Sequence, residues 1–93
     1  MENNFTMNRD NNRFEMQIDG HTAFIDYIAR DKSMSLIHTE VPKELEGKGH
    51  GRRLVENTLQ YMKENDYSLV PMCSFVVTYL KRHPEWNSLL EEK

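Results

Sequence analysis

The chain has 93 residues, enough for one small domain with a single modest core. With 38% hydrophobic residues, 29% charged residues and a formal net charge of −3, its composition is typical of a soluble globular protein. No apolar run approaches the roughly 18 residues of a membrane span. These numbers exclude a membrane protein and a second catalytic domain.

The N-terminal stretch is rich in asparagine and lacks the charged, apolar and small-residue pattern of a secretion signal. We therefore expect a flexible leader over residues 1–12 and a single domain over residues 13–93. The one cysteine, Cys73, has no partner for an internal disulfide. A reducing, cytoplasmic setting is the corresponding expectation.

Hydrophobic periodicity predicts three strands in the first half of the chain. Phe14, Met16 and Ile18 alternate with polar residues, which indicates a half-buried strand. Asp19 and Gly20 then predict a hairpin turn, and residues 22–30 read as the return strand. A further turn at residues 31–32 leads into a third strand over residues 33–41. The result is an antiparallel meander.

The second half predicts a crossover and terminal helices. Apolar residues at helical spacing indicate a helix over residues 51–65, a short strand over 68–72, a helix from Ser74 that Pro84 stops, and a last helix over 85–93. A strand, helix and strand in succession place strands 33–41 and 68–72 parallel and adjacent, in an α+β fold.

Pro71 is unusual because a proline in a central strand cannot donate to the ladder of hydrogen bonds. We expect the two parallel strands to diverge there. Diverging strands leave amides and carbonyls that an extended, amide-bearing ligand can pair with.

The loop before the first helix carries three of the four glycines at alternate positions, Gly47, Gly49 and Gly51. Glycines so spaced let successive amides point one way, and a helix N-terminus adds free N–H groups and a positive dipole end. Residues 43–53 also contain four cations and two anions. The pattern predicts a site for one small phosphorylated ligand. It disfavours nucleic acid, which needs an extended basic face.

Four segments in this order resemble the acetyl-coenzyme A site of the GNAT superfamily of N-acetyltransferases, and in particular its minimal single-domain family. They are His38-Thr39-Glu40-Val41-Pro42, Gly47-Lys48-Gly49-His50-Gly51 with Leu54-Val55, Pro71-Met72-Cys73-Ser74-Phe75, and Tyr79 with Arg82-His83-Pro84-Glu85-Trp86. The likeness covers about residues 14–90. It departs from the superfamily at Glu46, where glutamine or arginine is usual, and at His50, where an aliphatic residue is common.

The resemblance implies acetyl-coenzyme A as cofactor and a mixed α+β sheet as fold. The pyrophosphate is expected on the glycine loop, the pantetheine arm between the diverging strands, and further phosphate contacts at Arg82 or His83. The expected cofactor-binding residues are Thr39, Val41, Gly47, Lys48, Gly49, His50, Gly51, Arg52, Tyr79 and Arg82.

Cys73, His38 and Glu40 are the candidate catalytic residues. Cys73 precedes a helix, whose amides can lower a thiol pKa and favour the thiolate; the resemblance places it near the thioester, as an acyl relay or as part of the acyl pocket. His38 and Glu40 alternate onto one strand face together with Met34 and Leu36, where either could deprotonate an amine. The alternative is a histidine bonded at the sheet edge and a solvated glutamate. Tyr79 is either a proton donor to the departing thiolate or a core aromatic.

The sequence is compatible with three functions. The first is acetyl-coenzyme A dependent N-acetyl transfer to an unidentified amine, either directly or through Cys73. The second is a non-catalytic module that binds coenzyme A or acyl-coenzyme A, and the third is an interaction domain with a purely structural glycine loop. No metal site is expected, because the four histidines are scattered. The sequence does not identify the acceptor or the oligomeric state.

Overall fold

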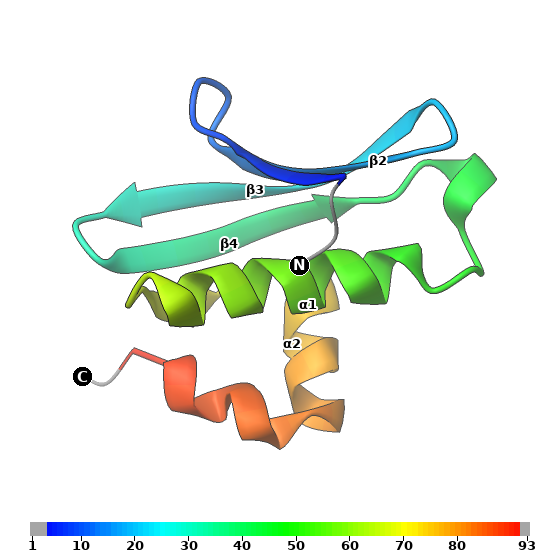
Figure 1. The fold of residues 1–93 in the computed structure, drawn as a ribbon. Coiled ribbons are helices and arrows are strands. Elements are labelled where there is room, and N and C mark those ends of the chain that lie inside the picture. Colours follow the sequence, from blue (N-terminus) through cyan, green and yellow to red (C-terminus); the bar gives the residue numbers. More distant parts are fainter. Residues whose placement is uncertain (1–3, 92–93) are drawn as a thin grey trace.

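The computed structural model describes residues 4–91 and shows one five-stranded sheet with helices on one of its faces (Figure 1). The strands lie in the order of the chain: β1 (Phe5–Asn8), β2 (Arg13–Ile18), β3 (His21–Arg30), β4 (Ser33–Glu40) and β5 (Ser68–Pro71). The helices are α1 (His50–Glu64) and α2 (Ser74–Arg82), with short 3-10 helices η1 (Lys43–Leu45) and η2 (Pro84–Leu89). The predicted α+β architecture is confirmed.

The meander of β2, β3 and β4 follows the sequence pattern closely. Asp19 and Gly20 have φ values of 49° and 79°, so the hairpin turn has both central residues in the left-handed region. Asp31, with φ of 53°, makes the next turn between β3 and β4. Both turns were expected at these positions.

The expectation of a flexible leader was wrong for residues 5–8. These residues form β1, an edge strand that pairs antiparallel with β2 from Phe5–Met16 to Asn8–Arg13. The ring of Phe5 stacks on that of Phe14, with ring centroids 5.8 Å apart. This apolar contact fixes a segment whose asparagines resemble those of a loop. Residues 1–3 of the predicted leader lie outside the described part.

β4 and β5 run parallel and then part, as expected. Their last pair is Leu36–Pro71, followed by one hydrogen bond from Met72 N to Leu36 O at 3.0 Å. A register shift also interrupts the pairing of β4 with β3, so that Ile37 is an extra residue on β4. β5 is the edge strand of the sheet rather than a central one, so Pro71 is tolerated there.

The core lies between the sheet and α1. The buried face of α1 carries Leu54, Val55, Leu59 and Met62, each fully buried. Burial of a side chain of this size stabilises the fold by about 1.5–3 kcal/mol. α1 begins and ends one residue earlier than the expected range of 51–65. No described helix covers the opposite face of the sheet, which we call the outer face (Figure 1).

The C-terminal segment differs from the helix expected over residues 85–93. Residues 84–89 form the 3-10 helix η2, and Leu90 then makes a parallel bridge with Leu69 of β5. Glu91 N donates to Leu69 O at 3.0 Å, so this segment covers part of the β5 edge. Residues 92 and 93 lie outside the described part. Between residues 4 and 91, no helix has both the length and the apolar character needed to cross a membrane.

Candidate functional site

The loop between η1 and α1 leaves a run of backbone amides without an acceptor. Glu46 N donates to Lys43 O at 3.2 Å, and the next amide with a backbone acceptor is that of Arg53, which donates to Gly49 O at 3.1 Å. Among residues 4–91, the amides of residues 47–52 form no hydrogen bond of regular geometry, although residues 46–49 make a hydrogen-bonded turn. Consecutive free amides at a helix N-terminus are a main-chain site for an anion.

The three glycines of this loop have two different roles. Gly47 and Gly49 have φ values of 79° and 78°, in the left-handed region that favours glycine. Gly51 is helical, and a Cβ there would stand 2.7 Å from Cζ of Phe75 and 3.2 Å from Cγ2 of Val41. Gly51 therefore allows close packing of α1 against α2 and against Val41, which follows β4, and only the other two shape the loop.

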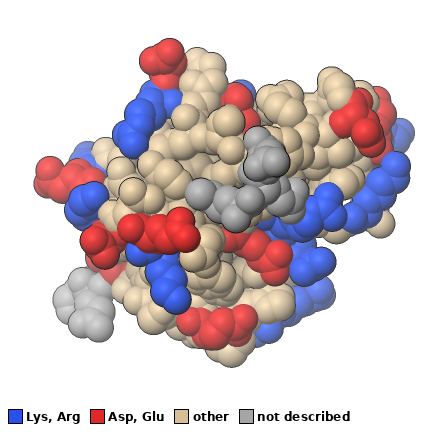
Figure 2. Space-filling model, in the orientation of Figure 1, with Lys and Arg blue, Asp and Glu red and all other residues tan. Residues whose placement is uncertain are grey.

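Cationic side chains surround the free amides. Arg52 and Lys48 are exposed, and the guanidinium of Arg53 contacts Nδ1 of His50. Figure 2 shows lysine and arginine side chains along the side of the molecule where Figure 1 places this loop. The loop thus combines main-chain donors with positive charge, as the sequence predicted.

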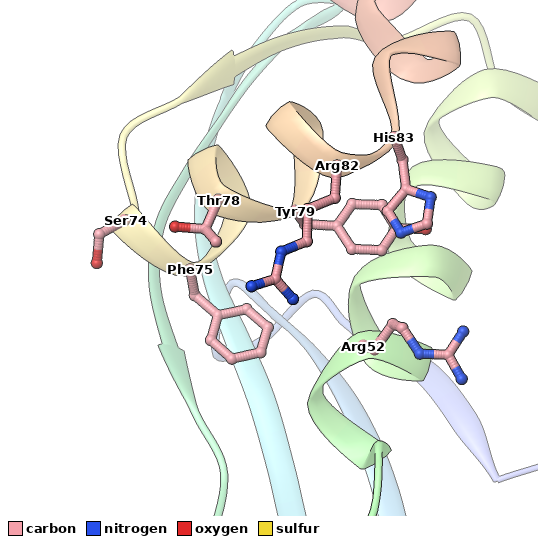
Figure 3. A pocket seen from close by; sticks show the side chains of 7 residues that line it. All are labelled: Arg52, Ser74, Phe75, Thr78, Tyr79, Arg82 and His83. Atoms are coloured by element: carbon pink, nitrogen blue, oxygen red, sulfur yellow. The ribbon is translucent and has the colours of Figure 1, made fainter.

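Two cavities adjoin the loop. The larger, of about 410 Å³, lies between α1 and α2 and is lined by Arg52, Ser74, Phe75, Thr78, Tyr79, Arg82 and His83 (Figure 3). The smaller, of about 250 Å³, is lined by Val41, Leu45, Glu46, Gly47, Gly49, His50, Gly51, Arg52 and Phe75. Both share Arg52 and Phe75, so the free amides and the space between the helices form one continuous surface.

Glu56 connects the two helices at this cavity. Its Oε2 accepts a hydrogen bond from the Tyr79 hydroxyl at 3.0 Å and an ionic one from Nη1 of Arg52 at 3.3 Å. The other terminal nitrogen of Arg52 lies 3.9 Å from where a Cβ on Gly49 would stand. Glu56 therefore holds the guanidinium next to the glycine loop. Sequence reasoning missed Glu56, because a glutamate on an exposed helix turn gives no local signal of such contacts. It named Phe75 only within the segment that resembles the acetyl-coenzyme A site, without a role.

Tyr79 keeps its proton over a wide pH range. Burial and the adjacent Glu56 carboxylate raise the pKa of Tyr79 to about 12. Its ring stacks on His83, with ring centroids 4.3 Å apart (Figure 3). A phenol with so high a pKa is a poor proton donor at neutral pH, and this weakens the expected role of Tyr79 as an acid.

Cys73 lies where β4 and β5 have parted. Its Sγ forms a hydrogen bond with Oγ1 of Thr39 at 3.3 Å. Burial raises the pKa of the Cys73 thiol, but the Thr39 hydroxyl and the backbone amides of Val76, Phe75 and Thr39 outweigh it, so the pKa lies below its usual range. Cys73 is the N-cap residue of α2, so its sulfur lies beside the first amides of that helix. The side chain is half-buried.

His38 and Glu40 form a pair on the outer face. Nε2 of His38 lies 3.1 Å from Oε1 of Glu40, and both side chains are more than half exposed. Thr39 lies between them on β4 and faces the helices, where it contacts Cys73. The structure thus brings His38 to Glu40 but sets the pair across β4 from Cys73. The expectation that the pair shares the face of Met34 and Leu36 was wrong, because the bulge at Ile37 turns His38 and Glu40 to the outer face.

Residues 4–91 contain no cluster of three or more histidine, cysteine, aspartate or glutamate side chains that could hold a metal ion.

Comparisons with known proteins agree with this geometry. The model of the GCN5-related N-acetyl-transferase family matches residues 13–89. Protein NATD1 of Xenopus tropicalis is 26% identical over 80 residues, which cover 82% of this chain and 72% of that protein. The solution structure of a GCN5-like protein from Staphylococcus aureus superposes with a TM-score of 0.70 at 23% identity, covering 99% of this chain and 93% of that one.

Proposed function

Because the chain belongs to the GCN5-related N-acetyltransferase family, we propose that it binds acetyl-coenzyme A and transfers the acetyl group to an amine. The observation that carries the proposal is the run of free amides over residues 47–52, beside Arg52 and a cavity of about 410 Å³. The family generally uses acetyl-coenzyme A. A diphosphate is the part of that cofactor which main-chain donors and cations suit best.

The residues present fit the cofactor on two counts. The loop supplies unoccupied donors, and Gly47 and Gly49 keep Cβ atoms away from them. Beyond the pair Leu36–Pro71, β4 and β5 no longer satisfy each other, which leaves the Thr39 and Val41 backbone able to pair with an amide-bearing arm. Arg82 and Tyr79 line the remaining space between the helices.

When bound, acetyl-coenzyme A supplies an acyl group held in a reactive thioester. Thr39 and the α2 amides favour the thiolate of Cys73, which makes this sulfur a nucleophile at the place where the strands part. His38 and Glu40 offer a proton acceptor on the outer face, because an amine must be neutral to attack. The amine then approaches from the outer face, opposite the cofactor.

Two routes fit this arrangement. In the direct route the amine would form the C–N bond while the thioester C–S bond breaks; His38 or Glu40 would take the amine proton, and coenzyme A would leave as the thiolate. In the relay route the Cys73 thiolate would first exchange with the thioester and release the coenzyme A thiolate, and the amine would then take the acetyl group from Cys73, which returns to the thiolate. Intact mass spectrometry after incubation with acetyl-coenzyme A distinguishes them, since only the relay gives an acetyl adduct that Cys73→Ala abolishes.

Transfer itself is tested with the full chain, acetyl-coenzyme A and two acceptors, butylamine and a short lysine peptide. We expect release of free coenzyme A thiol, detected with a thiol-reactive dye, and an acetylated amine detected by mass. If coenzyme A binds but no thiol is released with either acceptor, the result favours the non-catalytic binding module. The separation of Cys73 from the His38 and Glu40 pair by β4 gives that alternative its structural basis.

A further inference from the structure

The outer face of the sheet carries an apolar patch beside the place where β4 and β5 part. Ile28, Ile37 and Met72 are 53%, 38% and 65% exposed, which is unusual for side chains of this size. Ile28 pairs with Ser35, and Ser35 pairs with Val70, so Ile28, Ser35 and Val70 form one row across β3, β4 and β5.

A cavity opens on this row of residues. A cavity of about 440 Å³ is lined by Ile28, Arg30, Ser33, Ser35, Val70 and Glu91. Its volume lies in the range of ligand pockets, and its floor combines aliphatic side chains with two hydroxyls. None of the residues assigned above to the cofactor or to proton transfer lines this cavity. It is thus a binding surface separate from the acetyl-coenzyme A site.

This cavity and the His38–Glu40 pair share the outer face and the same strand. Ser35 pairs with Ile28 and His38 pairs with Asp26, two residues away on β3, so the two places are about 7 Å apart along the strands. Ile37 lies between them, in the bulge of β4. An acceptor that reached both places would follow β4 in an extended conformation.

The charge near the proton acceptor favours a cationic acceptor. Asp26, which pairs with His38, is neutralised by Arg13 at 3.1 Å. Glu15 and Glu40 flank Phe24 in the neighbouring row, and the Arg13 guanidinium lies over the Phe24 ring at 3.8 Å, so one cation and the three carboxylates of Glu15, Asp26 and Glu40 leave an excess of two negative charges. A protonated lysine is attracted to this end of the face before it gives up its proton.

We propose that the acceptor is a lysine of an extended polypeptide, which lies along the outer face of β4 and places an apolar side chain, two residues from the lysine and so on the same side of the extended chain, in the cavity over Ile28, Ser35 and Val70. The inference rests on the proposed function for the role of the lysine. A small free amine would reach the His38–Glu40 end only, and would gain nothing from the cavity or the apolar patch.

Peptide binding tests the proposal without turnover. Three fluorescent ten-residue peptides, otherwise of glycine, serine and threonine, carry a lysine with leucine two positions away, with leucine adjacent to it, or with serine in place of leucine. Anisotropy titrations against the full chain should give a dissociation constant about tenfold lower for the first peptide than for the other two. Equal affinity for all three peptides would overturn the proposal.

Variants locate the binding surface. Ser35→Trp fills the cavity and Ile28→Asp makes its rim polar; either should raise the dissociation constant of the first peptide about tenfold. Gln17→Trp is the matched control, an exposed position of β2 on the same face and away from the cavity. Thermal unfolding identifies any variant that is not folded. Unchanged peptide affinity in both folded cavity variants would refute the assignment.

Calorimetric titration with coenzyme A separates this inference from the proposed function. The cavity variants should bind coenzyme A as the parent chain does, because they lie outside that site. If the parent chain binds no coenzyme A, the proposed function fails. The peptide titrations would still show whether the outer face binds a polypeptide. In the transfer assay, butylamine acetylated as efficiently as the first peptide would contradict a polypeptide acceptor.

Discussion

The carboxylate of Glu56 accepts a hydrogen bond from the Tyr79 hydroxyl at 3.0 Å, and this contact joins α1 to α2 at the wall of the larger cavity. The same carboxylate oxygen accepts from Arg52. A single residue thus controls both the protonation of a tyrosine in the cavity and the position of a guanidinium beside the glycine loop.

Replacing Glu56 by glutamine should lower the pKa of Tyr79 from about 12 towards its ordinary value of 10.0, because the negative charge that opposes ionisation is removed. In the parent chain the raised pKa stabilises the fold fully below pH 10, and this contribution is lost as the pH rises towards 12. Urea unfolding at pH 8 and pH 11 should therefore show a smaller alkaline loss in Glu56→Gln. Tyr79→Phe serves as the control, and an identical alkaline loss in all three chains would contradict the assignment.

Glu56→Ala should weaken coenzyme A binding about fivefold, since Arg52 is then no longer held beside the loop. Pantetheine lacks the diphosphate, so its affinity should not change. In an Arg52→Ala background the second substitution should have no further effect on coenzyme A. Equal weakening for coenzyme A and pantetheine would instead mean that Glu56 acts only by supporting the fold.

Gly51→Ala should destabilise the protein, because its Cβ would stand 2.7 Å from Phe75 and 3.2 Å from Val41. We expect a loss of about 1–3 kcal/mol in the free energy of unfolding, typical of overpacking. Phe75→Leu in the same chain removes the closer contact and should recover most of that loss. If the double variant is as unstable as Gly51→Ala alone, the tight contact with Phe75 is not the cause.

Thr39→Val should raise the pKa of the Cys73 thiol, since the hydroxyl that favours the thiolate is lost. Alkylation by iodoacetamide follows the thiolate fraction, so at neutral pH it should slow several-fold in the variant. At a pH above both thiol pKa values the two chains should react alike. A rate at neutral pH that does not depend on Thr39 would exclude this hydrogen bond as the cause of the lowered pKa.

Most of the fold follows from short-range sequence signals. The alternation of Phe14, Met16 and Ile18 and the turn at Asp19 and Gly20 specify the meander, and Pro71 marks where β4 and β5 part. β1 was not predicted because its few apolar residues stand among asparagines, which are typical of loops. Its order comes from a contact between Phe5 and Phe14, which no local pattern contains.

The candidate site was predictable only in its local part. The glycine loop can be recognised from the sequence because one stretch of chain holds all its donors. The link from Glu56 to Tyr79 spans 23 residues and depends on how α1 packs against α2. Cys73 and the His38–Glu40 pair lie on opposite faces of the sheet. This arrangement also depends on the register of β4, which the bulge at Ile37 shifts.

The central claim is that the free amides of the glycine loop bind the diphosphate of coenzyme A. Gly47 and Gly20 offer a matched pair for testing it: both have φ of 79°, and a Cβ on either meets nothing within 4 Å. Alanine at either position should cost about 1–2 kcal/mol of stability through backbone strain alone. Gly20 lies in the hairpin turn between β2 and β3, away from the loop.

Calorimetric titration of coenzyme A into the parent chain, Gly47→Ala and Gly20→Ala is the most direct measurement of that claim. The parent chain and Gly20→Ala should bind with equal affinity, and Gly47→Ala should bind at least about tenfold more weakly. An affinity in Gly47→Ala equal to that of Gly20→Ala, or no binding by the parent chain, would contradict the account.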